Sequence, residues 1–129
     1  MNKIIVEVSI GELLDKISIL EIKQEKIKDP EKLKFISNEH SLLKNRLEIN
    51  VKSDDKLNSL FKSLKEINGK LWIIEDDKRL CEKNSDFGEK FIKLSRDVHF
   101  LNDERANIKL EINKFTKSKI KEIKEYTNY

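Results

Sequence analysis

Glycine, proline and cysteine are scarce in this chain. Its 129 residues include three glycines, one proline and one cysteine, whereas 40% are charged. So few turn-forming residues, together with abundant Lys, Glu, Leu and Ile, predict long helices joined by few turns. The lone Cys81 excludes an internal disulfide. A mainly α fold is therefore expected, as one compact domain over residues 1–129.

Long apolar runs are also missing. No stretch approaches the roughly 20 residues that a membrane-spanning helix needs. Near the N-terminus, Glu7 interrupts an apolar stretch that is already too short for a secretory signal. The sequence therefore predicts no association with a membrane and a cytoplasmic location.

No long block carries charge of one sign. The 27 basic and 24 acidic residues give a net charge of +3 and alternate along the chain, which is typical of solvated helix faces. Duplex binding needs a basic stripe with few acids between, and only residues 117–126 are mildly basic. Nucleic acid is not a favoured partner.

Several motifs of enzymes and metal sites are absent from the sequence. There is no glycine-rich phosphate loop, no Glu-x-x-His pair, and no repeated Glu-x-x-Glu pair of the kind that all-α nucleotide pyrophosphohydrolases use. Cys81 has no demonstrable base beside it and is expected to be a core residue rather than a nucleophile. The sequence assigns no metal ligand, cofactor or catalytic residue.

Two local signals mark helix starts. Ser9 and Glu12 form a capping box, in which each side chain caps a backbone N–H near the other, so a helix is predicted to begin near Ile10. Asp29 and Pro30 end that helix and start the next.

The two ends of the chain differ from its helical middle. Residues 1–8 alternate at Ile4, Val6 and Val8, which predicts an extended segment. We expect that segment to pack on the helices or on another subunit. Residues 117–129 are expected to form a C-terminal tail.

Four apolar seams, with spacings of three and four residues, predict four amphipathic helices. Short turns between them predict an antiparallel four-helix bundle. The seams comprise Ile10, Leu13, Leu14, Ile17, Leu20 and Ile27; Leu33, Ile36, His40, Leu43 and Leu47; Leu57, Leu60, Leu64, Ile67, Leu71 and Ile74; and Phe87, Phe91, Leu94, Val98, Leu101, Arg105, Ile108, Ile112 and Phe115.

Two polar residues interrupt these seams. His40 lies on the second seam and Arg105 on the fourth. Counting outward from the turns of an antiparallel bundle brings both to the level of Glu21 on the first helix. Such a layer is either a structural ion-pair network or part of a functional site. Groups with perturbed pKa values occur in both, so the sequence does not distinguish them.

The stretch from Trp72 to Arg79 places three consecutive acids behind a tryptophan and two isoleucines. If Leu71 and Ile74 face the core, Glu75 lies at the border of the seam and Asp76 points away. Glu75 is then predicted to be buried and paired with Arg79 or Arg96. The candidate binding or polar-network residues are Glu21, His40, Glu75, Asp76, Arg79, Arg96, Asn102, Asp103 and Arg105.

Several motifs together resemble a family of small bacterial and phage proteins of unknown function. Residues 8–23, within a matching stretch that begins at Val6, carry V-S-x-G-E-L-x-D-K-x-x-I-L-E-I-K, residues 72–79 carry W-x-I-E-D-D-x-R, and residues 102–105 carry N-D-x-R. The match covers nearly the whole chain but implies no activity, cofactor or catalytic residue. Two positions depart from the pattern: His99 replaces the usual Tyr, and Lys117 with Ser118 replaces a Gly-Ser turn.

These observations favour a small binding or accessory protein with an interior charged network. One alternative is an all-α enzyme for an anionic metabolite or nucleotide, with His40 or Glu75 as general acid or base and a divalent ion on the acids. A second is a structural helix-pairing module that self-associates through an exposed seam. The partners to test are a small anionic ligand, which Arg79, Arg96 and Arg105 would suit, and another copy of the chain.

Overall fold

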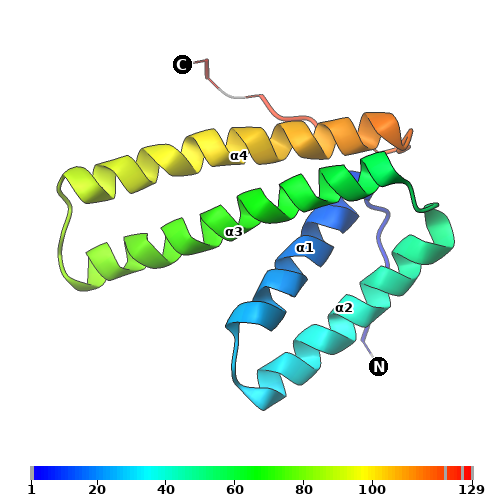
Figure 1. The fold of residues 1–129 in the computed structure, drawn as a ribbon, viewed down its shortest axis with the longest axis horizontal. Helices are drawn as coiled ribbons and strands as arrows, with labels where there is room; N and C mark the ends of the chain where they lie inside the picture. Colours follow the sequence, from blue (N-terminus) through cyan, green and yellow to red (C-terminus); the bar gives the residue numbers. More distant parts are fainter. Residues whose placement is uncertain (1, 121, 126, 129) are drawn as a thin grey trace.

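The computed structural model describes residues 2–120, 122–125 and 127–128. Within this part, the chain forms four helices and no β-strand: α1 (Ile10–Lys26), α2 (Pro30–Asn50), α3 (Asp55–Lys83) and α4 (Glu89–Phe115). Residues 2–9 are extended. The predicted mainly α, four-helix fold with an extended N-terminal segment is therefore confirmed (Figure 1).

Capping residues start the first two helices where the sequence predicts. Ser9 is the N-cap of α1, and its Oγ accepts a hydrogen bond from the N–H of Glu12 at 3.1 Å. Asp29 likewise caps α2, with Pro30 in the first turn. The reciprocal half of the predicted capping box is wrong, because the Glu12 carboxylate binds Lys109 on α4 instead of the Ser9 backbone.

The fourth helix begins later than predicted. The predicted fourth seam begins at Phe87, but α4 begins at Glu89 with Gly88 as its N-cap. Ser85 has a φ of 53°, in the left-handed region, which stops the helical path at that residue. Phe87 consequently lies in the turn and is exposed, although its spacing placed it on the seam.

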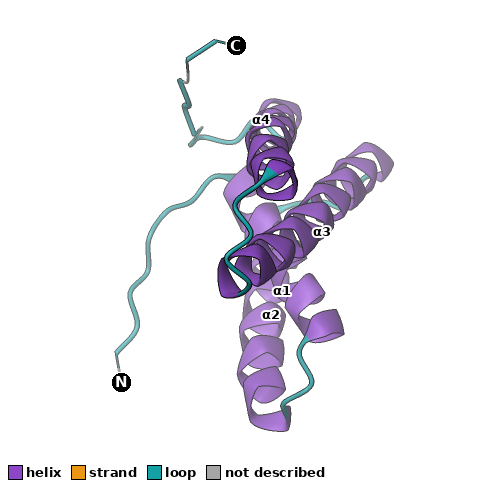
Figure 2. Ribbon diagram, turned by 90° about the vertical axis from the view of Figure 1, so that its left-hand side faces the viewer, coloured by secondary structure: helices purple, strands orange, loops and turns teal. Residues whose placement is uncertain are grey.

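The helices form two antiparallel hairpins that cross each other. α3 packs along α4 and α1 along α2, and the α1–α2 hairpin crosses the other near the start of α3 and the end of α4 (Figure 1). The backbone of α1 approaches all three other helices, whereas the backbone of α2 approaches only α1 among the helices described. Figure 2 shows the same crossing from one side. α1 is thus the central helix of the fold.

Burial follows this arrangement. On α1 only Lys16, Glu25 and Lys26 are exposed, because α2 covers one side of the helix and the α3–α4 hairpin covers another. Beyond the crossing, residues 71–101 form a two-helix arm in which Cys81 is the one fully buried residue of this wholly described stretch. The apolar core, formed by Leu14, Leu57, Leu64 and Ile112, therefore lies at the crossing.

α2 buries one face only. No α2 side chain is fully buried, and its half-buried residues are the predicted seam of Leu33, Ile36, His40, Leu43 and Leu47. The spacing of that seam thus identifies correctly the face that α2 turns toward α1.

The N-terminal segment is extended but does not pack on the helices. Ile4 is 91% exposed and Val6 is 68% exposed, and Figure 2 shows the segment leading away from the helical body. The prediction that this segment packs on the helices of its own chain is therefore wrong, and packing on another subunit stays a prediction. None of the four helices is both long and apolar enough to cross a membrane.

Candidate functional site

The N-terminus of α1 is anchored to the end of α4. The N–H of Ile10 donates to Ser118 Oγ at 3.2 Å, and the N–H of Gly11 donates to Asn113 Oδ1 at 2.7 Å. A helix leaves its first N–H groups without partners inside the helix. Ser9, Asn113 and Ser118 together satisfy the first three of these groups in α1, so this helix end does not offer free donors to a ligand.

Gly11 lets the two helices approach this closely. A Cβ added at Gly11 would lie 2.6 Å from the carbonyl oxygen of Lys109 and 2.9 Å from Asn113 Oδ1. Real Cβ atoms do not approach backbone oxygen to 2.6 Å, so any larger residue must push α1 away from α4. Glycine at this position therefore sets the distance over which the polar contacts below are made.

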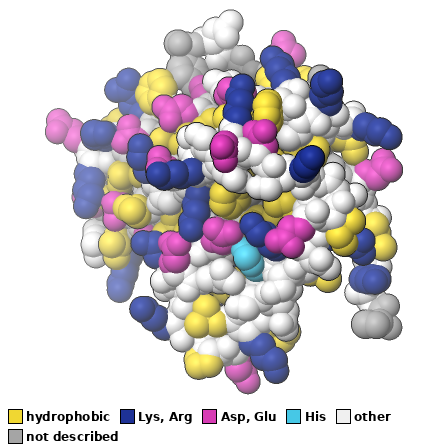
Figure 3. Space-filling view, turned by 45° about the vertical axis from the view of Figure 1, so that its right-hand side comes forward, with side chains coloured by type: hydrophobic (Ala, Val, Ile, Leu, Met, Phe, Trp, Pro, Cys, Tyr) yellow, Lys and Arg dark blue, Asp and Glu magenta, His cyan; other side chains and the backbone are white. Residues whose placement is uncertain are grey.

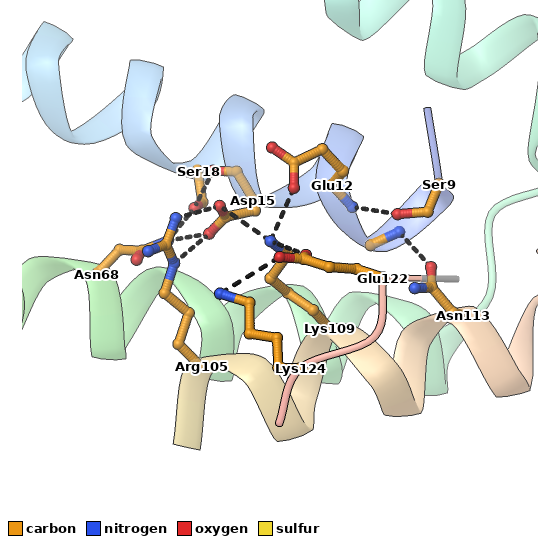
Figure 4. A network of polar contacts seen from close by, with 11 residues as sticks. Ser9, Glu12, Asp15, Ser18, Asn68, Arg105, Lys109, Asn113, Glu122 and Lys124 are labelled. Carbon is orange, nitrogen blue, oxygen red and sulfur yellow. Dashed lines mark hydrogen bonds and ion pairs between the residues drawn. The ribbon is translucent and has the colours of Figure 1, made fainter. Parts of the chain in front are cut away.

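Asp15 is the centre of a buried polar network (Figure 4). Its side chain is 2% exposed, and its Oδ1 accepts from Arg105 Nε at 2.9 Å and from Asn68 Nδ2 at 2.8 Å. Its Oδ2 accepts from Arg105 Nη2. Ser18 Oγ accepts a second bond from Asn68 and donates to the Asp15 carbonyl. The carboxylate, which α1 carries, is thereby bound from α3 and α4 at once.

Lys109 continues this network toward the C-terminal tail. Its Nζ lies 2.7 Å from Glu12, 2.6 Å from Glu122 and 3.9 Å from Asp15, and only 6% of its side chain is exposed. Glu122 also pairs with Lys124 at 3.3 Å. The tail is therefore joined to the helices by a largely buried ammonium group.

The pKa values follow from these contacts. Burial acts to lower the pKa of Lys109, but hydrogen bonds to Glu12 and Glu122 and the charge of Asp15 outweigh it and raise that pKa. Hydrogen bonds to Asp15 raise the pKa of Arg105 against the effect of burial. The hydrogen bond from Lys109 lowers the pKa of Glu122. All three groups are thus held in their charged forms.

The network is closed by its own members. Both carboxylate oxygens of Asp15 are occupied, and the buried Lys109 is surrounded by acids. The one buried side-chain atom without a hydrogen-bond partner in the described part of the chain is Asn113 Nδ2. An arrangement of this kind stabilises one packing of the helices.

An open groove adjoins the network between α1, α3 and α4. Its volume is about 360 Å³, and we call it the Trp72 groove. Ile19, Ile22, Leu71 and Trp72 supply most of its apolar surface, and its polar border combines both signs of charge. The lining residues are Ile19, Ile22, Asn68, Leu71, Trp72, Glu75, Asp76, Arg79 and Arg105. Four of the nine candidate residues therefore meet at one surface.

Glu21 and His40 form a second polar group, as the sequence predicts. His40 Nε2 lies 3.0 Å from Glu21 Oε2, and Lys65 of α3 lies 3.3 Å from Glu21 and 2.8 Å from Glu25. The hydrogen bond to Glu25 raises the pKa of Lys65 and lowers that of Glu25. This cluster joins α1, α2 and α3, and it does not line the Trp72 groove.

Arg105 does not share that layer, contrary to the prediction. It binds Asp15, which precedes Glu21 by six residues or about 9 Å of helix rise. Counting residues from the turns assumed four nearly parallel helices. Because the two hairpins cross instead, equal distances from the turns do not give equal heights.

The predicted burial of Glu75 is also wrong. Glu75 and Asp76 are both exposed, and within the described chain no ion pair joins Glu75 to Arg79 or Arg96. Leu71 and Ile74 turn inward as expected, but the arm has no third helix to cover its flank, so the border residue Glu75 stays in solvent. Arg96 is exposed and borders a hollow with Ile92 and Asp97, apart from the residues of the Trp72 groove.

The remaining candidates, Asn102 and Asp103, lie on α4 and are half-buried.

The residues that the sequence prediction missed are Asp15, Ser18, Asn68, Lys109 and Asn113. A signal for them exists: Gly11, Asp15 and Ser18 repeat at helical spacing on α1, and Arg105, Lys109 and Asn113 are four residues apart on α4. Two such polar stripes predict two helix faces that meet.

Charged side chains of both signs are interspersed with hydrophobic ones over the face of the molecule in Figure 3. In the part of the chain that the structure describes, no three His, Cys, Asp or Glu side chains gather in a way that could hold a metal ion.

Comparison with known proteins identifies one family. Residues 4–129 match the model of a family of unknown function, DUF6165, and the chain belongs to that family. Neither the curated proteins nor the solved structures contain a match to this chain.

Proposed function

We propose that this DUF6165 member is a small helical binding or accessory protein that docks an amphipathic segment of a partner protein in the Trp72 groove. One observation carries the proposal: the groove combines an apolar floor containing Trp72 with a border of both charges, whereas the buried network is closed by its own contacts. Protein-binding surfaces usually have an apolar centre and a polar rim, and they are enriched in Trp and Arg side chains.

The chemistry of the partner follows from the groove. Four apolar side chains suit the apolar face of a helix, as in other complexes where a helix lies in a groove. Charge complementarity predicts a basic residue on the partner helix where it faces Glu75 and Asp76, and an acidic residue where it faces Arg79. Because α1 contacts every other helix, we take residues 1–129 to act as one domain. We propose that this domain acts in the cytoplasm.

A selection experiment tests the proposal. Trp72 is the only tryptophan, so its fluorescence reports directly on the groove. We expect peptides selected from an unbiased displayed library to show apolar residues at helical spacing and to shift Trp72 emission on binding. Their affinity should fall at least about tenfold for Arg79→Glu, which reverses an exposed charge at the rim. Phe87→Ala, in the turn at the far end of the arm, is the matched control and should bind normally.

Selected peptides that bind wild type and Arg79→Glu equally, without changing Trp72 emission, would refute the groove as the docking surface. Arg79→Glu also serves as the target of a second selection. Because its rim is more acidic than that of wild type, the peptides that bind it should contain more basic residues. Failure to shift the charge of the selected peptides would also count against the proposal.

A specific observation favours a second candidate, the capture of a small anion. Arg105 uses Nε and Nη2 for Asp15, and no hydrogen bond among the described residues involves its Nη1. Arg79 borders the same groove. Titration with inorganic phosphate and with pyrophosphate, against equal ionic strength of NaCl, should then raise thermal stability and alter Trp72 emission. Loss of this response in Arg79→Gln would support anion capture, and its absence in wild type would remove it.

A further inference from the structure

α2 carries a second apolar stripe, on the face opposite the seam that contacts α1. Phe35, Leu42 and Ile49 are 76%, 65% and 66% exposed, although they are large hydrophobic side chains. They recur every seven residues, and Asn38 and Asn45 lie between them and are also exposed. The spacings of three, four, three and four residues are those of a coiled-coil seam. We call these five residues the outer stripe.

Nothing in the described chain covers this stripe. The inner seam of α2 is offset from it by two residues, or about 200° around the helix, so the two stripes lie on opposite faces. The backbone of α2 approaches only α1, which lies on the inner side (Figure 1). A helix of 21 residues, about 31 Å long, therefore presents a full coiled-coil face to solvent.

We propose that the outer stripe pairs with the outer stripe of a second copy of this chain, antiparallel, about a two-fold axis beside Leu42. This interface lies apart from the Trp72 groove, and the proposal does not depend on the function of that groove.

The alternation of apolar residues and asparagines along the stripe is the same in both directions. With the axis at Leu42, the two Leu42 side chains meet, and Phe35 of each copy packs on Ile49 of the other. Asn38, four residues before the axis, then comes within one residue of the level of Asn45 of the second copy, three residues after it, so each buried amide can donate to and accept from another amide. A polar layer of this kind fixes the register of paired helices.

The charges beside the stripe agree with the antiparallel arrangement. Residues on the same flank of the stripe face each other in an antiparallel pair, so Lys34 meets Glu48 of the second copy, and Glu39 meets Arg46. All four are exposed, and only Glu39 has an ion-pair partner among the described residues, Lys16 at 3.3 Å. Every charged flank position thus gains a partner of opposite sign.

A parallel pair fits less well. Lys34 would then face Glu39 of the second copy, but Arg46 would face Ser41, and Glu48 would face Ser53. Identical side chains would also meet along the whole stripe. Antiparallel pairing is therefore the arrangement that uses all of the flanking charges.

The first test is the oligomeric state of the full chain, measured by analytical ultracentrifugation over a wide concentration range. We expect a reversible dimer for wild type. Leu42→Glu would place two carboxylates at the axis and should weaken dimerisation at least about 100-fold, while helicity by circular dichroism stays unchanged because Leu42 is exposed in the protomer. A wild-type chain that is monomeric at millimolar concentration, or a Leu42→Glu dimer of unchanged affinity, would overturn the proposal.

A charge-exchange pair tests the orientation. Lys34→Glu alone should weaken the dimer, because it sets a new carboxylate against Glu48 of the second copy, and adding Glu48→Lys should restore the wild-type affinity. In a parallel dimer the second change could not rescue the first, since residue 34 would face Glu39 instead. Failure of the rescue would overturn the antiparallel arrangement.

Disulfide trapping supplies an independent readout. Leu42→Cys should form a covalent dimer on mild oxidation, because the two residues lie at the axis, whereas Asn38→Cys should not link to itself across several residues of offset. Native Cys81 is buried and serves as an internal control for unspecific oxidation. Efficient self-linking of Asn38→Cys, as well as of Leu42→Cys, would identify a parallel pair and overturn the proposal.

Discussion

The two ends of the α3–α4 hairpin are built differently. At the crossing with α1, which we call the junction, residues 57–68 and 105–118 contain Leu57, Leu64, Asn68 and Ile112 as buried side chains. In the arm, residues 71–101 contain only Cys81, although this stretch is fully described and carries six residues of the predicted seams: Leu71, Ile74, Phe91, Leu94, Val98 and Leu101. The same seam therefore gives a core where a third helix covers it and an exposed two-helix arm where none does.

This difference separates stability from recognition. A two-helix hairpin cannot enclose its own side chains, so its apolar residues remain available: Ile73, Leu80, Ile92 and Phe100 are each about half exposed. The junction holds the charges that are costly to bury and satisfies them with one another. Substitutions should consequently have large effects on unfolding at the junction and small ones in the arm.

Asp15→Ala should give the largest effect. Removing this carboxylate leaves Arg105 and Lys109 partly buried without a central partner, which costs about 3–5 kcal/mol of unfolding free energy. Glu75→Ala, in the exposed arm, should change it by less than about 1 kcal/mol. Urea denaturation of both variants measures the difference, and similar losses would abolish the distinction between junction and arm.

Two leucines on α3 extend the comparison to apolar side chains. Leu64 is 0% exposed at the junction and Leu80 is 52% exposed in the arm. Leu64→Ala should leave a cavity and cost about 2–5 kcal/mol, whereas Leu80→Ala should cost under about 1 kcal/mol because little apolar surface returns to water. The two variants form a matched pair, because each replaces a leucine of α3 by alanine and both residues have high helix propensity. A Leu80→Ala loss as large as that of Leu64→Ala would mean that the arm is covered in solution.

Two glycines offer a test that involves no charge. Gly11→Ala brings a methyl group against the Lys109 carbonyl and should destabilise by about 1–3 kcal/mol. Gly69→Ala meets nothing within 4 Å in the interior of α3 and should instead stabilise by up to about 1 kcal/mol. Thermal unfolding should therefore show a lower melting temperature for Gly11→Ala and a higher one for Gly69→Ala. A stabilising Gly11→Ala would show that α1 can move away from α4 without an energetic cost.

Lys117→Gly should have a smaller, stabilising effect. Lys117 has a φ of 55°, in the left-handed region that favours glycine, where it ends α4 and leads into the tail. Glycine removes the steric penalty of a side chain there, so unfolding should become harder by about 0.5–1 kcal/mol. Calorimetry measures the shift, and Lys119→Gly, outside a helix, is the control that should give none of this gain.

Local chemistry in the sequence predicted most of the fold. Ser9 and the Asp29–Pro30 pair act through neighbours a few residues away, so helix starts could be inferred without knowing the tertiary structure. The inner face of α2, including His40, followed from spacing alone. Each of these features depends on a single helix or a single turn.

Features that depend on how hairpins cross could not be inferred in the same way. Asp15 was overlooked and Glu75 was assigned to the interior, because both assignments need the angle between the two hairpins. Gly11 permits close contact of α1 with α4 beside Lys109 and Asn113, but a glycine in the sequence does not by itself show which helix it meets. The polar stripes on those two helices record the contact, but reading them requires pairing two helices that are about 90 residues apart in the chain.

The smallest expected effect concerns the tail, at the edge of the junction. Lys109 lowers the pKa of Glu122 below its ordinary value of 4.5, so their contact stabilises the folded chain fully above that value and loses its contribution as the pH falls through the lowered pKa. Glu122 is 35% exposed, and solvent screening limits the contribution to about 0.5 kcal/mol or less. Glu122→Gln should therefore be slightly less stable than wild type at pH 7, and the gap should close as the pH falls through the lowered pKa of Glu122, where its carboxyl becomes neutral like the amide of glutamine. Hydrogen exchange should show the same trend at the Ser118 amide, which donates to the Asn113 carbonyl where the tail leaves α4, with little change in residues 71–101. A stability gap between the two proteins that does not shrink with acidification would mean that the gap does not come from this ion pair.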